Sequence, residues 1–230
     1  MQQPKLNNFP RAALIDMDGT LYDSMGNHAD AWLRVATEAG IKAERDEFFL
    51  YEGRTGASTI DILFNRQFGR NATDQEKKDL YHLKTVYFQE LPPVHPMPGA
   101  RRLLEALKHA GIKRVLVTGS GQNSLLSRLK TDFPGLLRED LRITSADVMH
   151  GKPHPEPYLK AIDMALTTAP FCVAFENAPL GVESAHRAGV FTVGITTGPV
   201  PADKLKEAGA DIVYNSMEEC ADLFPELLYK

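Results

Sequence analysis

Residues 12–15 form an apolar run, Ala-Ala-Leu-Ile, that leads directly into a D-x-D-G sequence. The run predicts a short buried strand. Alternate strand residues point the same way, so we expect Asp16 and Asp18 to leave the strand end as two neighbouring carboxylates. Like charges this close are unfavourable unless a cation or a shared proton relieves them, and Gly19 allows a sharp turn. The pattern indicates a divalent metal beside an aspartate nucleophile, although D-x-D-G is also common in plain strand-to-loop turns.

From residue 98 onward, short apolar runs alternate with stretches of helical spacing. This alternation predicts an α/β fold with a doubly wound parallel sheet covered on both faces by helices. Ligands of such sheets bind outside the carboxyl ends of the strands. The expected strands are 114–118, 171–175, 192–195 and 211–213, and the expected helices lie near 99–110, 121–131, 155–166, 178–188, 201–208 and 216–228.

The stretch after the first strand has helical spacing instead. Apolar residues at helical intervals precede Gly40 and again Gly69. A third helix is expected over 73–91, where Thr73-Asp74-Gln75-Glu76 has a capping-box pattern. We therefore expect a helical domain inserted into the α/β core. The predicted boundaries are 1–23 and 94–230 for the core domain and 24–93 for the helical domain.

Composition excludes several classes of function. The 230-residue chain has a net charge of −4 and no dense Lys/Arg run, so it carries no footprint for nucleic acid. No apolar stretch approaches the roughly 18 residues of a membrane span, and the first residues lack an apolar signal region. Two cysteines do not make a disulfide framework. We expect a cytoplasmic monomer that acts on a small molecule, with no membrane or nucleic-acid partner.

A second polar motif, Val117 to Gly121, follows a predicted strand. The Thr118 hydroxyl and the amides of Gly119 and Ser120, where a helix is expected to start, would make an oxyanion site for phosphate. Ser120 as an ordinary helix N-cap is the alternative.

A third motif places Lys152 in a Pro-rich loop that opens a helix. Taken alone, Lys152 would be a surface lysine. His150 and His154 are four residues apart in a Pro-rich loop, with Pro153 between them, and this pattern indicates no metal site there.

The fourth motif, Glu176-Asn177, comes between a buried strand and a helix. Both side chains offer oxygen ligands that suit a hard cation, and Asn177 as a helix cap is the competing interpretation.

These four motifs resemble, in order and over nearly the whole chain, those of the haloacid dehalogenase (HAD) superfamily. The first is D-x-D-G-T-L-x-D-S from Asp16 to Ser24, and the third is G-K-P-x-P-x-x-Y ending at Tyr158. The resemblance implies a Rossmann-like core with an inserted helical cap and an Mg²⁺-dependent phosphotransferase working through an aspartyl-phosphate. The family commonly has an aspartate where this chain has Asn177, which removes one negative charge from the metal site.

The resemblance also implies roles for individual residues. Asp16 would be the nucleophile and Asp18 the acid and base, with Thr118 and Lys152 holding the transferring phosphoryl group. To act as an acid near pH 7, Asp18 needs a pKa well above its ordinary value of about 3.9. The metal would be held by Asp16, by the backbone carbonyl oxygen of Asp18, by Asn177 and, through water, by Glu176.

The predicted cap resembles that of the β-phosphoglucomutase-like subgroup. His28 lies where the mutases have a hinge histidine, with Trp32 four residues later, but the mutase cap arginine is replaced by Gly56, and Arg54 directly follows Gly53. Residues 51–59 with Tyr81, His82 and Lys84 instead resemble HAD-type inorganic pyrophosphatases, in which a cap glutamate, here Glu52, reaches the metal. The alternatives are an exposed Glu52, a core Tyr81 and a solvated Lys84.

The predicted function is a Mg²⁺-dependent phosphohydrolase, either an inorganic pyrophosphatase or a phosphatase of small phosphomonoesters. A β-phosphoglucomutase is the second hypothesis, and a non-catalytic phosphate-binding module is the third. Substrate contacts are expected from Gly119, Ser120, His28, Arg54, Tyr81 and Lys84.

Overall fold

The computed structural model describes residues 6, 8–121 and 123–229. Its centre is a six-stranded parallel sheet with the order β3-β2-β1-β4-β5-β6. The fold class predicted from the sequence is confirmed. The strands are β1 Ala12–Ile15, β2 Lys113–Val117, β3 Arg142–Ile143, β4 Cys172–Glu176, β5 Phe191–Ile195 and β6 Ile212–Tyr214.

Alternate residues of β1 face two different hydrophobic clusters, as a sheet covered on both sides requires. Ala13 and Ile15 belong to a cluster with the leucines of α5 and with Phe224 of α10. Ala12 and Leu14 belong to a second cluster with apolar residues of α7 and α8. All four β1 residues are fully buried. The helices of this part are α5 Ala100–His109, α6 Asn123–Asp132, α7 Glu156–Ala165, α8 Pro179–Arg187, α9 Ala202–Glu207 and α10 Met217–Leu227.

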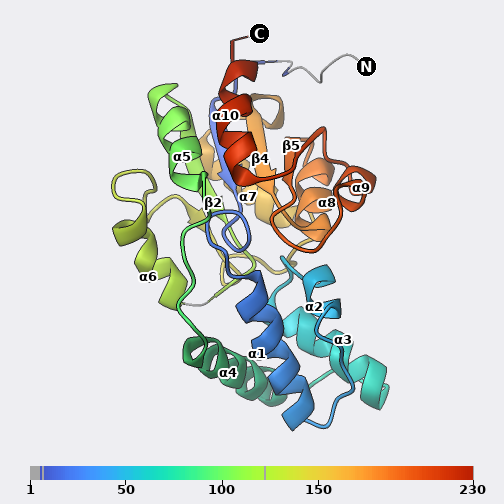
Figure 1. Cartoon of the computed structure of the whole chain (residues 1–230). Coiled ribbons are helices and arrows are strands. Elements are labelled where there is room, and N and C mark those ends of the chain that lie inside the picture. The colour runs from blue at the N-terminus through green and yellow to red at the C-terminus, as the bar shows by residue number, and fades with distance from the viewer. Residues whose placement is uncertain (1–5, 7, 122, 230) are drawn as a thin grey trace.

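Four helices between β1 and α5 form what we call the helical insert. They lie together at the bottom of Figure 1, and the sheet with its remaining helices lies above them. Helix α1 packs against α4, and α4 packs against α3. The predicted capping box is present at the start of α4, where Thr73 and Glu76 each bond the other's backbone N–H. The insert helices are α1 Met25–Glu38, α2 Glu47–Leu50, α3 Gly56–Phe68 and α4 Asp74–Glu90.

Three local features differ from the sequence-based expectation. The two-residue β3 and the four-residue α2 were not predicted, because elements this short carry too little periodicity. The helix expected from about 121 begins at Asn123 in the described part of the chain, and the predicted Ser120 N-cap depends on residue 122, which lies outside the described residues. The Ser120 amide donates to Thr118 Oγ1 at 3.0 Å. Cys172 and Cys220 are buried free cysteines. Among the described residues no helix is both long and apolar enough to cross a membrane.

Candidate active site

The predicted site residues meet where the strand order reverses direction. Strand β1 lies between β2 and β4; Asp16 directly follows β1, Thr118 directly follows β2, and Glu176 is the last residue of β4. Because all three strands are parallel, these ends lie at one edge of the sheet, which is where doubly wound folds bind ligands. Asp16, Thr118 and Glu176 are all buried.

Lys152 joins two carboxylates at this edge. Its ammonium lies 2.6 Å from Asp16 Oδ1 and 2.5 Å from Glu176 Oε1, and it also donates to the Val117 carbonyl at 3.1 Å. The side chain is 1% exposed, so the surface-lysine interpretation is wrong. Burial alone would lower the pKa of Lys152, but Asp16 and Glu176 raise it, so the ammonium stays charged.

The ammonium of Lys152 does not balance the negative charge of the buried carboxylates at this edge. Burial, reinforced by Glu176 and by Asp18, raises the pKa of Asp16 to about 8 despite the ammonium of Lys152. Glu176 Oε1 also accepts a hydrogen bond from the Tyr158 hydroxyl at 2.5 Å. Its other oxygen, Oε2, is buried and has no hydrogen-bond partner among the described residues. An unpaired buried carboxylate oxygen in a cluster of acids fits a divalent cation with oxygen ligands.

Asp18 is held by a chain of buried polar side chains. Its Oδ1 accepts from Ser24 Oγ at 2.7 Å and lies 2.8 Å from His28 Nε2. Lys84 Nζ lies 2.5 Å from His28 Nδ1. An ammonium can only donate, so Nδ1 of His28 accepts and its Nε2–H donates to Asp18. Lys84 is 3% exposed, and the interpretation of a solvated Lys84 is therefore wrong.

These contacts lower the pKa of Asp18, whereas a raised pKa was expected from the sequence. Burial by itself would raise it, but His28, the Ser24 hydroxyl and Lys84 lower the pKa below its ordinary value. Burial and the charge of Lys84 lower the pKa of His28, which favours the neutral ring. The expectation of a raised Asp18 pKa is wrong for this arrangement, because the hydrogen bonds stabilise the carboxylate.

A loop of the helical insert closes over the strand ends. Gly53 has a left-handed backbone with φ of 87°, and a Cβ there would lie 3.0 Å from Lys152 Cδ. A Cβ on Gly119 would lie only 2.3 Å from the Gly53 carbonyl oxygen. The insert and the core therefore touch backbone to backbone. This contact requires glycine at Gly119, and the left-handed backbone favours glycine at Gly53.

This loop brings Glu52 into the site. Ligand atoms of Glu52, Asp18 and His28 all lie within 4.8 Å of one another, and the Glu52 side chain is partly buried. Burial and the charges of Asp18 and Asp16 raise the pKa of Glu52 to about 8. The alternative of an ordinary exposed glutamate is wrong.

Other expected substrate contacts line the same cavity from both sides. The Tyr81 hydroxyl of α4 accepts from the Gly121 amide at 3.2 Å, so it links the insert to the second motif. Arg54 Nη1 donates to Ser58 Oγ at 3.2 Å, while its buried Nε has no partner among the described residues. The cavity has a volume of about 40 Å³. Its lining consists of Asp16, Asp18, His28, Trp32, Phe48, Tyr51, Glu52, Gly53, Arg54, Gly56, Thr59, Tyr81, Lys84, Thr118, Gly119 and Ser120.

Asn177 is buried but engaged elsewhere. Its Oδ1 accepts from Thr20 Oγ1 at 3.3 Å, and its amide nitrogen lies 2.6 Å from the Met25 sulfur. It does not line the cavity. The helix-cap interpretation is wrong, because α8 begins at Pro179 with Ala178 as its N-cap. An amide oxygen bonded to Thr20 would have to exchange that partner in order to bind a metal.

The fold and these strand-end side chains are typical of enzymes that bind phosphate at a parallel sheet. Residues 10–189 match a family model described as haloacid dehalogenase-like hydrolase. The chain belongs to the haloacid dehalogenase-like hydrolase family, and its relatives place it in the β-phosphoglucomutase-like subgroup.

Two sequence relatives and one solved structure illustrate this likeness. Hexitol phosphatase A of Escherichia coli (strain K12) is 30% identical, with 90% of this chain and 91% of that protein covered. Beta-phosphoglucomutase of Bacillus subtilis (strain 168) is 29% identical, with 96% and 94% covered. A structure titled "Putative beta-phosphoglucomutase from Bacteroides vulgatus" is 41% identical with a TM-score of 0.92, covering 96% of this chain and 90% of that one.

Proposed function

We propose that the protein is a Mg²⁺-dependent phosphohydrolase that works through a phosphorylated Asp16, with inorganic pyrophosphate or a small phosphomonoester as substrate. In this proposal residues 24–93 form a lid over the core made of 1–23 and 94–230. The observation that carries the choice of a small substrate is Glu52. Its carboxylate comes from the helical insert and lies with Asp18 and His28 in a cavity of about 40 Å³. That volume is smaller than any of the candidate substrates, so the lid must open for each of them, and pyrophosphate requires less opening than a hexose phosphate.

The residues at the strand ends divide the chemistry among them. Asp16 attacks phosphorus in line and forms an acyl-phosphate bond while the bond to the leaving oxygen breaks. Asp18 protonates that oxygen and then takes a proton from the water that hydrolyses the intermediate. Because hydrogen bonds keep Asp18 ionised in the free protein, we expect it to gain its proton only when substrate is bound. Thr118 and Lys152 would hold the transferring group.

A divalent cation fits the charge deficit described above. When bound, Mg²⁺ would neutralise phosphate charge and polarise the phosphorus for attack. The residues that would hold it are Asp16, Asp18, Glu176 and Asn177, with Glu52 completing the set from the lid. Pyrophosphate carries its negative charge on a very short molecule, so it would repel the Glu52 carboxylate of the lid. A cation between the pyrophosphate and Glu52 would remove this repulsion.

The proposal is tested by measuring phosphate release from a panel of pyrophosphate, hexose phosphates, small phosphomonoesters and nucleotides. Wild type is compared with Asp16→Asn prepared in the same way, so that a contaminating phosphatase is detected. We expect kcat/KM for pyrophosphate or a small phosphomonoester to exceed that for hexose phosphates by at least about tenfold, which is roughly 1.4 kcal/mol. Faster release from hexose phosphates would contradict a small substrate.

A mutase is the second candidate. It is favoured by the similarity to two proteins named as β-phosphoglucomutases, one of them as "Putative", and by the buried chain of side chains from Lys84 through His28 to Asp18. Incubation with β-glucose 1-phosphate and a bisphosphate primer separates the two candidates. Conversion to glucose 6-phosphate faster than any phosphate release would replace the hydrolase proposal.

A further inference from the structure

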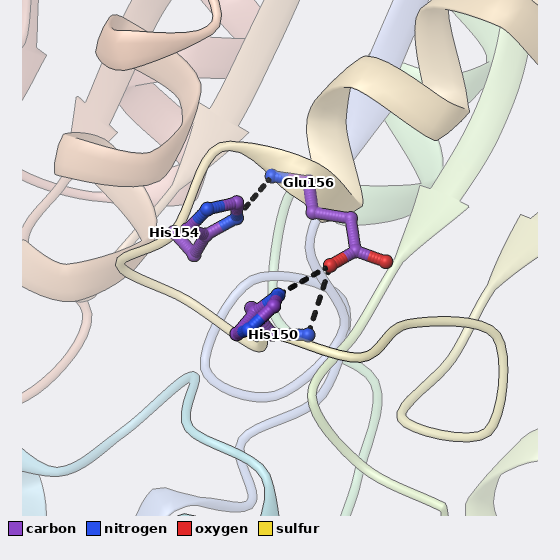
Figure 2. Close-up of side chains that lie close together, drawn as sticks. All are labelled: His150, His154 and Glu156. Carbon is purple, nitrogen blue, oxygen red and sulfur yellow. Dashed lines mark hydrogen bonds and ion pairs between the residues drawn. The ribbon is translucent and has the colours of Figure 1, made fainter.

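The loop that carries Lys152 presents a second polar cluster on its outer side. The intervening Pro153 does not keep His150 and His154 apart: their ring centroids are 4.7 Å apart, with 36° between the ring planes. Ligand atoms of these two histidines and of Glu156 all lie within 4.8 Å of one another. Figure 2 shows the His150 ring beside the Glu156 carboxylate and the His154 ring beside the Glu156 backbone nitrogen, at the start of α7.

The loop folds back because its backbone is tied at several points. The His154 amide donates to the Gly151 carbonyl at 3.0 Å, which makes a tight turn between the histidines. The Glu156 carboxylate accepts the amides of Met149 and His150, each at 2.9 Å. Groups that orient a carboxylate or imidazole are a regular part of protein metal sites. This cluster is therefore arranged before any ion binds.

We propose that His150, His154 and Glu156 bind one borderline divalent transition-metal ion, with zinc as the type case. Two imidazoles and one carboxylate, with water in the remaining position, are a regular zinc ligand set. Zinc–nitrogen bonds of about 2.0–2.1 Å put tetrahedral ligand atoms about 3.3 Å apart, and the present spacing is within 4.8 Å. His150 is exposed, so rotation of its ring closes this difference.

The ion takes the place of two existing contacts. Glu156 Oε2 lies 3.1 Å from His150 Nδ1, and an ion between them replaces this contact. His154 Nδ1 accepts the Glu156 amide at 3.2 Å, and binding through Nδ1 displaces that amide. The positive charge of Lys160 repels a bound cation, but its ammonium lies 3.0 Å from the other Glu156 carboxylate oxygen, Oε1.

The cluster differs in chemistry from the site at the strand ends. Imidazole favours zinc, nickel and copper over magnesium, which prefers oxygen ligands. We therefore expect millimolar Mg²⁺ to leave the histidine cluster free. Lys152 lies between the two histidines, so an ion at this cluster ties together both sides of the loop that holds it. Because such an ion binds the folded state, zinc should raise the Tm.

The test is a zinc titration against a chromophoric chelator, in excess Mg²⁺, of wild type and the double variant His150→Ala/His154→Ala. His109→Ala is the matched control, because His109 is exposed and belongs to neither group of potential ligands found in the described part of the chain. We expect the double variant to bind one equivalent of zinc less than wild type, and His109→Ala to bind the same number as wild type. Any zinc taken up at Asp18, His28 and Glu52 is the same in all three proteins, so it does not change the difference in stoichiometry between them.

Thermal unfolding supplies a second readout. Zinc should raise the Tm of wild type and of His109→Ala, and raise it less in the double variant. Neither His150 nor His154 has a role in the proposed reaction, so the double variant should keep its Mg²⁺-dependent activity, which also shows that it folds. If it does not fold, the single variant His150→Gln replaces it in both measurements. Equal zinc stoichiometry and equal Tm shifts in wild type and variant would overturn the proposal.

Discussion

Replacement of Glu52 by glutamine removes one charge from the lid and keeps the shape of the side chain. We expect Glu52→Gln to lower kcat/KM for pyrophosphate by at least about tenfold, or roughly 1.4 kcal/mol. Unit charges about 4.8 Å apart interact by about 3.5 kcal/mol at an effective dielectric constant of about 20, and Glu52 lies within 4.8 Å of Asp18. A cation bound between these carboxylates would replace their repulsion by an attraction of similar size. Water in the cavity screens the charges and makes this attraction weaker.

The same substitution should have the opposite effect on stability without metal. The pKa of Glu52 is raised from 4.5 to about 8 in the folded protein. A raised folded-state pKa means that stability is fully present below about pH 4.5 and is lost as the pH rises through about 8. Glutamine does not ionise, so the metal-free variant should match wild type near pH 4.5 and exceed it at pH 9. A gain of about 1 kcal/mol corresponds to roughly 2–4 °C in Tm.

The assay compares kcat/KM for pyrophosphate and for a generic small phosphomonoester in wild type and variant, with Tm measured in a chelator at both pH values. Loss on the phosphomonoester should be smaller, because that substrate can use the site with the lid open. Equal losses on both substrates, or none on pyrophosphate, would refute contact between Glu52 and the metal. A variant less stable than wild type at pH 9 would show that Glu52 has a structural role instead.

Four further outcomes are expected. Asp16→Asn should abolish turnover in a protein with an unchanged circular dichroism spectrum; substantial metal-dependent hydrolysis would remove Asp16 as nucleophile. Asp18→Asn should lose nearly all activity in steady-state kinetics, and a fully active variant would remove its acid and base role. Exhaustive chelation should stop phosphate release, with Mg²⁺ restoring more activity than the larger Ca²⁺; unchanged activity after chelation argues against any metal. Gly119→Ala should lower kcat/KM at least about tenfold with little change in Tm, because its Cβ meets the Gly53 carbonyl and holds the lid open; normal kinetics would mean that this backbone contact is not needed.

The sheet was predictable because its signals are local. The apolar run of β1 and its D-x-D-G ending place a strand and a turn without tertiary information, and the capping box of α4 is contained in four consecutive residues. Strand β3 has only two residues, and its place at the sheet edge depends on pairing with β2. No sequence pattern predicts a strand of only two residues.

The contacts that set protonation were not predictable in the same way. Lys152 meets Asp16 across 136 residues, and Lys84 meets His28 across 56. The family resemblance predicted that Lys152 and Asp18 share a site, but no sequence pattern predicted that Asp18 accepts two hydrogen bonds that keep its pKa low. The meeting of the His150 and His154 rings depends on the turn from Gly151 to His154, which contains Pro153. These properties follow from tertiary packing, which brings polar groups into hydrogen-bond distance.

The closed lid bears directly on the choice between hydrolysis and phosphoryl transfer. A mutase must keep water from its phosphorylated aspartate until the second hydroxyl of the substrate arrives. Here the backbone of Gly53 already touches Gly119, and Glu52 lies in the remaining cavity of about 40 Å³. A hexose bisphosphate would have to hold this lid open, and an open lid admits water to Asp16. Water would then compete with the sugar for the phosphoryl group, so we expect phosphate release to dominate even when a hexose phosphate is bound.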